Sequence, residues 1–167
     1  MTTSTSAPAA GAPATGAPAT GAPATAEGTL AETAAALARN SGEWLARVRF
    51  DPQGRWYERL HRDGDREIWL ISWLPGQSTG LHDHGGSRGA FAVALGALEE
   101  SDPGAVRTLA PGEVRAFGPD YVHEVRNTSA APAVSVHAYS PPLAAMNRYD
   151  LVGGRPVLRD TEEAGRW

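Results

Sequence analysis

Three histidines have the types and spacing of a metal site. His82 and His84 are separated by one residue, so on an extended backbone both side chains lie on one face and can bind one ion together. The chain has no cysteine, so any metal must be held by histidines and carboxylates. A lone His-x-His pair fits a surface or satisfied core position as well as it fits a metal site. The later His123, with glycine, proline and asparagine neighbours, favours a three-histidine metal site.

The residues around these histidines resemble the two sequence motifs of the cupin superfamily. For the first motif they are Gly76, His82, His84 and Gly96, and for the second they are Gly118, Pro119, His123 and Asn127. Many cupins place an acidic ligand four or five residues after the second histidine, where this chain has Arg88 and Gly89. Without that carboxylate, a dipositive ion would have three neutral imidazoles and open positions for an anionic bidentate ligand and O₂.

A second polar set alternates along one candidate strand. Ser135, His137 and Tyr139 are each separated by one apolar residue, so the three polar side chains share one face of an extended segment. Two interpretations remain open. Facing inward, the set would form a hydrogen-bonded relay from serine through histidine to the phenol, whereas facing outward it would be the solvated face of a strand.

The chain resembles the cysteine dioxygenases over residues 56–150. The matching segments are His82-Asp83-His84, Ser87, Gly89 and Phe91, Val122 to Val125 with Asn127, and Pro132 to Pro142. The most diagnostic part is the Ser-x-His-x-Tyr-Ser-Pro-Pro run, which begins at Ser135. Upstream, Tyr57-Glu58-Arg59 occupies the place of the family's Tyr-x-Arg substrate strand. The family implies a mononuclear, non-haem Fe(II) enzyme that adds both atoms of O₂ to a thiol sulfur, giving a sulfinate.

The resemblance also implies a role for each matching residue. The iron ligands would be His82, His84 and His123. Arg59 would anchor the substrate carboxylate, and Tyr57 would line the substrate pocket. Tyr139 would be the active-site phenol, supported by His137 and Ser135. In animal members a cysteine is cross-linked to this tyrosine. At the matching place this chain has Gly89, which resembles the bacterial members.

The expected reaction converts L-cysteine and O₂ to cysteine sulfinate. The position of Arg59 favours cysteine, because relatives that prefer 3-mercaptopropionate have glutamine there. Dioxygenation of 3-mercaptopropionate or another small thiol is the nearest alternative. A non-catalytic cupin that binds a metal or a small ligand is a third reading, and it would need no inward Ser-His-Tyr set.

Short strands must position these residues. Thr29 and Glu32 predict a capped helix ending near Asn40, and residues 43–48 a second helical piece. The predicted strands are residues 55–62, 67–74, 91–95, 98–100, 105–109, 114–117, 123–127 and 133–139. This pattern predicts a mainly β fold, a small cupin-type antiparallel β-barrel (jelly roll) with a short helical N-terminal portion. Ser140-Pro141 is a candidate cis peptide, and residues from Met146 onward are expected to have mixed structure.

Composition limits the domain count and the partners. Residues 1–27 include three copies of Gly-Ala-Pro-Ala-Thr, which predicts a disordered tail before one cupin thiol dioxygenase domain at residues 28–167. The net charge is −4 and every basic side chain is arginine, which argues against a nucleic-acid partner. The longest run without polar residues is too short to span a bilayer. We therefore expect a cytoplasmic monomer with no membrane partner.

His61 lies in neither histidine motif, so we expect it to be a solvated strand residue.

Overall fold

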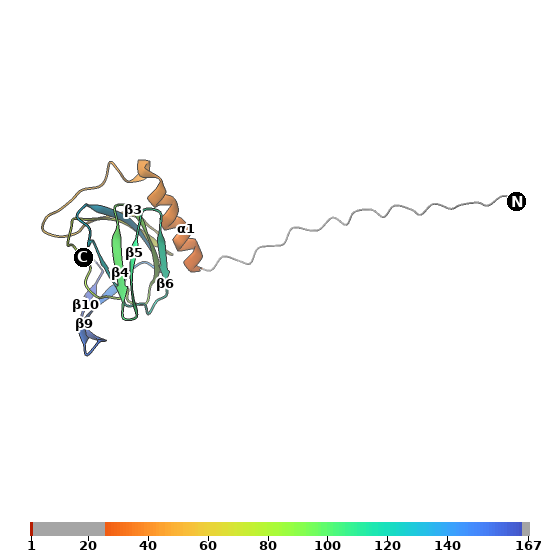
Figure 1. Cartoon of the computed structure of the whole chain (residues 1–167). Helices are drawn as coiled ribbons and strands as arrows, with labels where there is room; N and C mark the ends of the chain where they lie inside the picture. The colour runs from red at the N-terminus through yellow and green to blue at the C-terminus, as the bar shows by residue number, and fades with distance from the viewer. Residues whose placement is uncertain (2–25, 165–167) are drawn as a thin grey trace.

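Antiparallel strands are the main secondary structure in the part of the chain that the structure describes, which is Met1 and residues 26–164 of a computed structural model (Figure 1). One helix, α1 (Ala26–Arg39), precedes them. In this part of the chain the strands are β1 (Trp56–Arg62), β2 (Glu67–Trp73), β3 (Arg88–Leu95), β4 (Leu98–Asp102), β5 (Ala105–Leu109), β6 (Val114–Phe117), β7 (Glu124–Arg126), β8 (Ala133–Ser140), β9 (Ala145–Val152) and β10 (Arg155–Glu163). The mainly β cupin-type fold with a helical start is confirmed.

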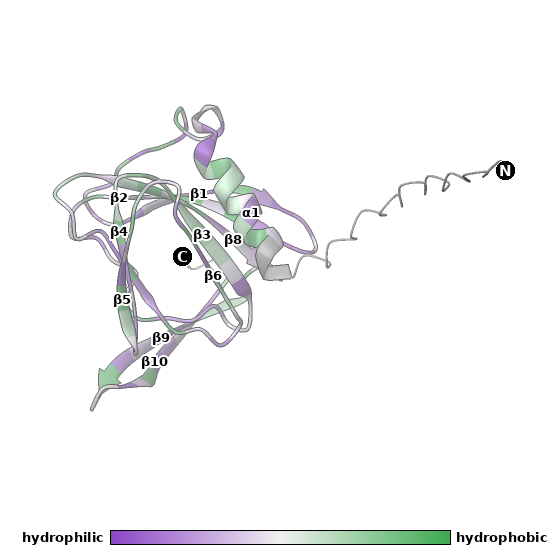
Figure 2. Ribbon diagram, turned by 45° about the vertical axis from the view of Figure 1, so that its right-hand side comes forward, coloured by the Kyte–Doolittle hydropathy of each residue, from purple (hydrophilic) through white to green (hydrophobic). Residues whose placement is uncertain are grey.

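The strands form three antiparallel sheets. A five-stranded sheet has the order β1-β2-β8-β3-β6, a three-stranded sheet has the order β5-β4-β7, and β9 pairs with β10. Figure 2 shows β3, β6 and β8 on one side of the molecule, β4 and β5 on the other, and the β9–β10 hairpin projecting at one end. The hydrogen-bonded ladder does not close into a continuous barrel. Isolated bridges link the sheets instead, such as His82 with His123 and His82 with Arg148.

Helix α1 covers the outer face of the five-stranded sheet (Figure 2). Its small and apolar residues, such as Leu30 and Ala34, pack against Val134, Val136 and Ala138 of β8. Because side chains alternate along a strand, the other face of β8 is turned toward the space between the sheets. That inner face carries Ser135, His137 and Tyr139, and all three are buried. The outward, solvated interpretation of this polar set is therefore wrong.

Eight of the observed strands lie where the sequence predicts them, with ends that differ by a few residues. The helix begins at Ala26, so Thr29 lies inside it and not at its N-cap. The second predicted helical piece is a short 3₁₀ turn at Ser41–Glu43 followed by turns. The C-terminal region forms the β9–β10 hairpin, whose mostly exposed side chains gave the sequence no apolar alternation. The Ser140-Pro141 peptide is cis, as predicted.

Two further predictions concern the ends of the chain and membranes. Residues 2–25 of the predicted tail lie outside the described residues, so that prediction stays untested. Among the helices of the described part, none has both the length and the apolar character needed to cross a membrane.

Candidate metal centre and substrate pocket

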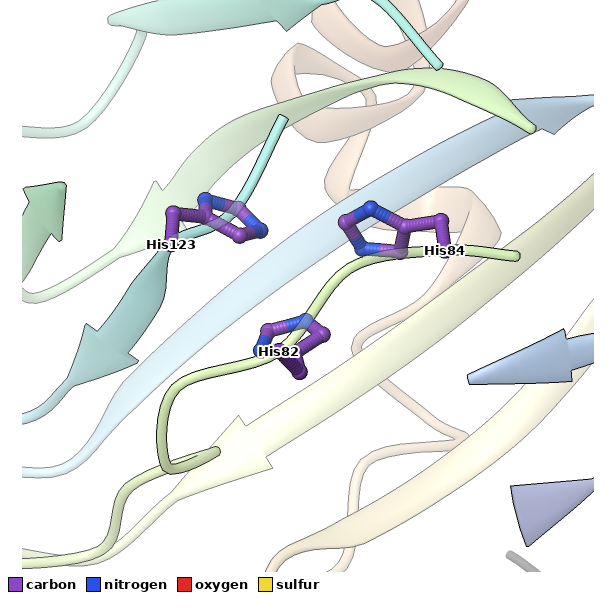
Figure 3. Close-up of side chains that lie close together, drawn as sticks. All are labelled: His82, His84 and His123. Carbon is purple, nitrogen blue, oxygen red and sulfur yellow. The ribbon is translucent and has the colours of Figure 1, made fainter. Parts of the chain in front are cut away.

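The three predicted metal-binding histidines meet inside the molecule (Figure 3). His82 and His84 lie on the loop between β2 and β3, and His123 directly precedes β7. The backbones of His82 and His123 exchange two hydrogen bonds of 2.9 Å, which bring the two cupin motifs together. The candidate ligand nitrogens all lie within 4.8 Å of one another. The side chains are only 3%, 1% and 2% exposed, so any ion held there would be shielded from solvent.

Asp83 holds the loop that carries His82 and His84. Its side chain points away from theirs and accepts hydrogen bonds from Tyr149 Oη at 2.6 Å and from Asn147 Nδ2 at 3.0 Å, both on β9. The hydrogen bond to Asp83 raises the pKa of Tyr149 to about 12, so the phenol keeps the donated proton at neutral pH. The His-Asp-His triplet thus directs its histidines inward and its aspartate toward the C-terminal hairpin.

The outward ring nitrogens of the three histidines have different partners. Nδ1 of His82 lies 3.0 Å from the carbonyl oxygen of Gly80, and Nδ1 of His123 lies 2.9 Å from Oε1 of Glu100. Nδ1 of His84 is buried without a hydrogen-bond partner in the described part of the chain. A neutral imidazole that donates from Nδ1 has a lone pair on Nε2, which is the atom left to face a shared ion.

The donor set fits a borderline divalent transition metal. Burial, followed by the neighbouring imidazoles, holds the pKa of His82 and His84 well below the ordinary value, so both rings stay neutral, the form that binds metal. The cluster found among the described residues contains three histidines and no carboxylate. Such a nitrogen-only set suits iron or zinc better than Mg²⁺ or Ca²⁺, which prefer oxygen ligands.

A hydrogen-bonded chain runs along the inner face of β8 beside this cluster. Trp73 Nε1 donates to Ser135 Oγ at 2.9 Å, Ser135 Oγ lies 2.8 Å from His137 Nε2, and His137 Nδ1 lies 3.3 Å from the Tyr139 hydroxyl. The Tyr139 ring is 5.0 Å from the His84 ring, centroid to centroid. The hydrogen-bonded relay predicted from the alternation of these side chains is therefore present as geometry, and it includes Trp73, which the alternation along β8 did not indicate.

The hydrogen-bond partners of each residue in this relay determine where its protons lie. The indole nitrogen of Trp73 only donates, so the buried hydroxyl of Ser135 can give its own proton only to Nε2 of His137. A neutral His137 then has its proton on Nδ1 and donates it to the oxygen of Tyr139. Burial raises the pKa of Tyr139 above the ordinary value, so the phenol stays protonated. Its hydroxyl hydrogen is consequently free to point toward a ligand.

His137 predicts an acid-sensitive fold. Burial, followed by electrostatic interaction with His123 and Arg55, lowers the pKa of His137 to about 3, while the same residue in the unfolded chain titrates near 6.5. As the pH falls below 6.5, the imidazole of His137 takes up a proton in the unfolded state but not in the folded state. The contribution of His137 to the free energy of unfolding is therefore complete above pH 6.5 and is lost as the pH falls. Between pH 7.5 and pH 5 the loss is about 2 kcal/mol. Urea unfolding of the metal-free protein at both pH values should show a smaller loss for His137→Gln than for the wild type; equal losses would contradict the assignment.

Gly89 explains sterically why no side chain stands opposite Tyr139. It pairs with Tyr139 across β3 and β8. A Cβ at this position would lie 2.6 Å from the Phe117 ring and 2.8 Å from Cδ1 of Tyr139. The space that a cross-linking cysteine would need is thus taken by Phe117, which stacks on His84 with ring centroids 4.8 Å apart.

A pocket adjoins the histidine cluster and shares Tyr139 with the relay. Its lining is aromatic and aliphatic, with two arginines and no acidic residue: Arg55, Tyr57, Trp69, Ile71, Tyr139, Leu143, Met146 and Arg148. Tyr139 lies against His84, and Arg148 forms a backbone bridge with His82, so both connect the pocket to the histidine cluster. Trp69 is one of the lining residues, and its Nε1 is buried without a hydrogen-bond partner in the described part of the chain.

The structure brings Tyr57 to this pocket but not Arg59. The Arg59 side chain is exposed and lies over the ring of Trp69, 5.5 Å from its centroid. Arg55, four residues earlier on the same strand face, lines the pocket instead and lies over the ring of Trp73 at 5.3 Å. Arg55, Tyr57 and Arg59 are each two residues apart, so alternation predicts one shared face for all three. Alternation therefore could not show which of the two arginines reaches the pocket. His61 is exposed and pairs with Asp63, as expected for a solvated strand residue.

The two pocket arginines differ in their partners. Arg148 donates to Oε2 of Glu162 at 2.8 Å and to the Thr79 carbonyl at 3.0 Å. Arg55 has no acidic partner among the described residues, and burial together with the charge of Arg148 lowers its pKa. An unpaired guanidinium is costly in such a place, so Arg55 is the stronger candidate for binding an anionic ligand.

Sequence comparisons identify one family. Residues 24–152 match the family model described as cysteine dioxygenase type I. Cysteine dioxygenase type 1 of Rattus norvegicus is 28% identical in an alignment 131 residues long, which covers 69% of this chain and 65% of the rat protein. The Danio rerio protein of the same name is 26% identical in an alignment 128 residues long, which covers 66% of this chain and 63% of the fish protein. The aligned part is thus less than two thirds of the length of either relative.

Solved structures share the fold. An RmlC-like cupin protein from Desulfovibrio desulfuricans superposes with a TM-score of 0.54 at 26% identity, covering 59% of this chain and 93% of that chain. A Klebsiella pneumoniae protein with a double-stranded β-helix domain gives a TM-score of 0.53 at 20% identity, covering 68% of this chain and 90% of that chain. The second likeness concerns the fold alone.

Proposed function

The chain belongs to the cysteine dioxygenase type I family, and on this premise we propose that it is an Fe(II)-dependent thiol dioxygenase that converts L-cysteine to cysteine sulfinate. The observation that supports this most is the contact of the Tyr139 ring with both His84 and His137 beside a pocket containing an unpaired arginine. This arrangement combines a metal site, a protonated phenol and an anion-binding group in one place.

The histidines His82, His84 and His123 would hold the iron, each through one neutral imidazole. The bound ferrous ion supplies the redox chemistry by which both atoms of O₂ are added to the thiol sulfur. The protein's own contribution is to keep the site buried and the ligand rings fixed, so that substrate and O₂ meet in a defined, largely dry space.

Arg55 is the proposed anchor of the substrate carboxylate, in place of Arg59. A charge-assisted bond between this guanidinium and a carboxylate is worth on the order of 1.5 to 3 kcal/mol in a partly dry pocket. Two arginines and no acidic residue in the lining favour a thiol that carries a carboxylate over a cationic aminothiol.

Tyr139 is the proposed catalytic donor. Its oxygen accepts a hydrogen bond from Nδ1–H of His137, so its own hydroxyl hydrogen can be donated to the substrate or to oxygen atoms on which negative charge develops. His137 and Ser135 act through Tyr139 by keeping this orientation, and Trp73 holds Ser135.

Side-by-side turnover of three thiols tests the proposal. The iron-loaded protein is expected to consume O₂ with cysteine and to form the sulfinate, to act more slowly on 3-mercaptopropionate, and to act least on cysteamine, which lacks a carboxylate. Oxygen consumption and mass spectrometry of the product measure this. Faster turnover of 3-mercaptopropionate would reassign the substrate, and no turnover of any thiol by a protein that retains iron would favour a non-catalytic metal-binding cupin.

A further inference from the structure

Of the three metal-site histidines, only His123 is hydrogen-bonded to a charged group. Its Nδ1 lies 2.9 Å from Oε1 of Glu100, and the side chains of His123 and Glu100 are 2% and 0% exposed. The matching nitrogen of His82 has a backbone carbonyl, and that of His84 has no partner in the described part of the chain. The three imidazoles therefore differ in how strongly their outer contact pushes electron density toward an ion.

Glu100 is held so that each carboxylate oxygen has a separate task. Oε1 faces His123, while Oε2 accepts a hydrogen bond from Arg115 Nε at 2.7 Å and lies 3.6 Å from Arg107. Arg107 is itself paired with Asp102 at 2.7 Å, and Arg115 also reaches the hydroxyl of Tyr121. Sheet pairing contributes as well, because Glu100 on β4 lies opposite Val125 on β7, two residues after His123. The carboxylate is thus fixed, charged and aimed at the ligand ring.

We propose that Glu100 is a positioning residue that supplies, one hydrogen bond beyond His123, the negative charge that the carboxylate-free histidine set lacks. This inference rests on the metal site of the proposed function. By accepting a hydrogen bond from Nδ1–H, Glu100 selects the tautomer whose Nε2 lone pair faces the ion, and it makes that imidazole a stronger electron-pair donor to the ion. Arg115 and Arg107 draw on the same carboxylate, so they limit how much of its charge reaches the ring.

Substitution of Glu100 by glutamine separates charge from hydrogen bonding, because the amide oxygen can still accept from Nδ1. The matched control is Glu67→Gln. Glu67 is also 0% exposed, and it also pairs with an arginine, Arg62, at 3.0 Å, but it accepts from the backbone of Leu143 and not from a histidine. Both substitutions remove one buried carboxylate, so both are expected to lower thermal stability.

Only the Glu100 variant is expected to change the metal itself. Under anaerobic conditions Glu100→Gln should bind Fe(II) roughly 10- to 100-fold more weakly than the wild type, as is usual for the loss of an outer ligand partner, while Glu67→Gln should stay within about threefold. The Fe(III)/Fe(II) midpoint potential of Glu100→Gln should move to more positive values, because the variant has lost a negative charge that stabilises the ferric state relative to the ferrous state.

Arg115→Met provides an opposite-sign test that does not depend on the folding of the glutamine variant. The Arg115 side chain is partly exposed and its removal frees charge on Glu100, so the midpoint potential should move to more negative values. Unchanged affinity and potential in folded Glu100→Gln, or a positive shift in Arg115→Met, would overturn the proposal. Because these readouts need only bound iron, they remain valid if thiol turnover fails and the proposed reaction is wrong.

Discussion

Replacing His84 by alanine is expected to abolish stoichiometric Fe(II) binding and, with it, thiol turnover. The remaining imidazoles of His82 and His123 form an incomplete site, and the loss of affinity should exceed the roughly 10- to 100-fold that follows from removing an outer partner. Anaerobic titration with Fe(II), with iron content per chain measured after gel filtration, gives the result directly.

His61→Ala is the matched control for this prediction. His61 is a histidine of the same chain that is exposed on β1 and pairs with Asp63, and it does not belong to the histidine cluster found in the described residues. Its variant should bind one Fe(II) per chain like the wild type. Retention of stoichiometric iron by His84→Ala would exclude the three-histidine site.

Arg55→Ala is expected to lower kcat/KM for cysteine by roughly 10- to 150-fold, the change that corresponds to losing about 1.5 to 3 kcal/mol of a charge-assisted bond in the transition state. Arg55 lines the pocket and has no acidic partner among the described residues, so its guanidinium is available to pair with the carboxylate of the proposed substrate. Any slow background turnover of cysteamine should hardly change, because this thiol offers no carboxylate to Arg55.

Arg59→Ala separates Arg59 of β1 from Arg55, the residue directly before that strand. The exposed Arg59 contacts the ring of Trp69 and does not line the pocket, so its removal should change kcat/KM for cysteine less than twofold. Oxygen consumption measured with cysteine and cysteamine for both variants decides between them. A large loss in Arg59→Ala with little change in Arg55→Ala would return the anchor to the position that the family resemblance indicated.

Local chemistry in the sequence determined much of the candidate site. The one-residue spacing of His82 and His84, and of Ser135, His137 and Tyr139, requires a shared face on any extended backbone, whatever the rest of the chain does. Glycine and proline turns bounded most strands within a few residues. The absence of cysteine excluded thiolate ligands and a thioether cross-link before any coordinates were needed.

Only the tertiary structure decided which face of β8 is the inner one. Both faces of that strand are buried, one under α1 and one between the sheets, so alternation alone could not choose between a relay and a wet surface. The same limit applies to β1 and the residue before it, because alternation gives Arg55, directly before the strand, the same expected face as Arg59. The register of β1 shifts between Arg59 and His61, and the pocket lies beside Arg55.

The contact of Glu100 with His123 is equally a product of the fold. The two residues are far apart in the chain, and they meet because β4 pairs with β7 in one register. Period-two alternation describes neighbours along a strand, whereas contacts across strands depend on which strands pair and how they are aligned. The sequence therefore determined which side chains were available for chemistry, and the pairing of the strands decided which of them act together.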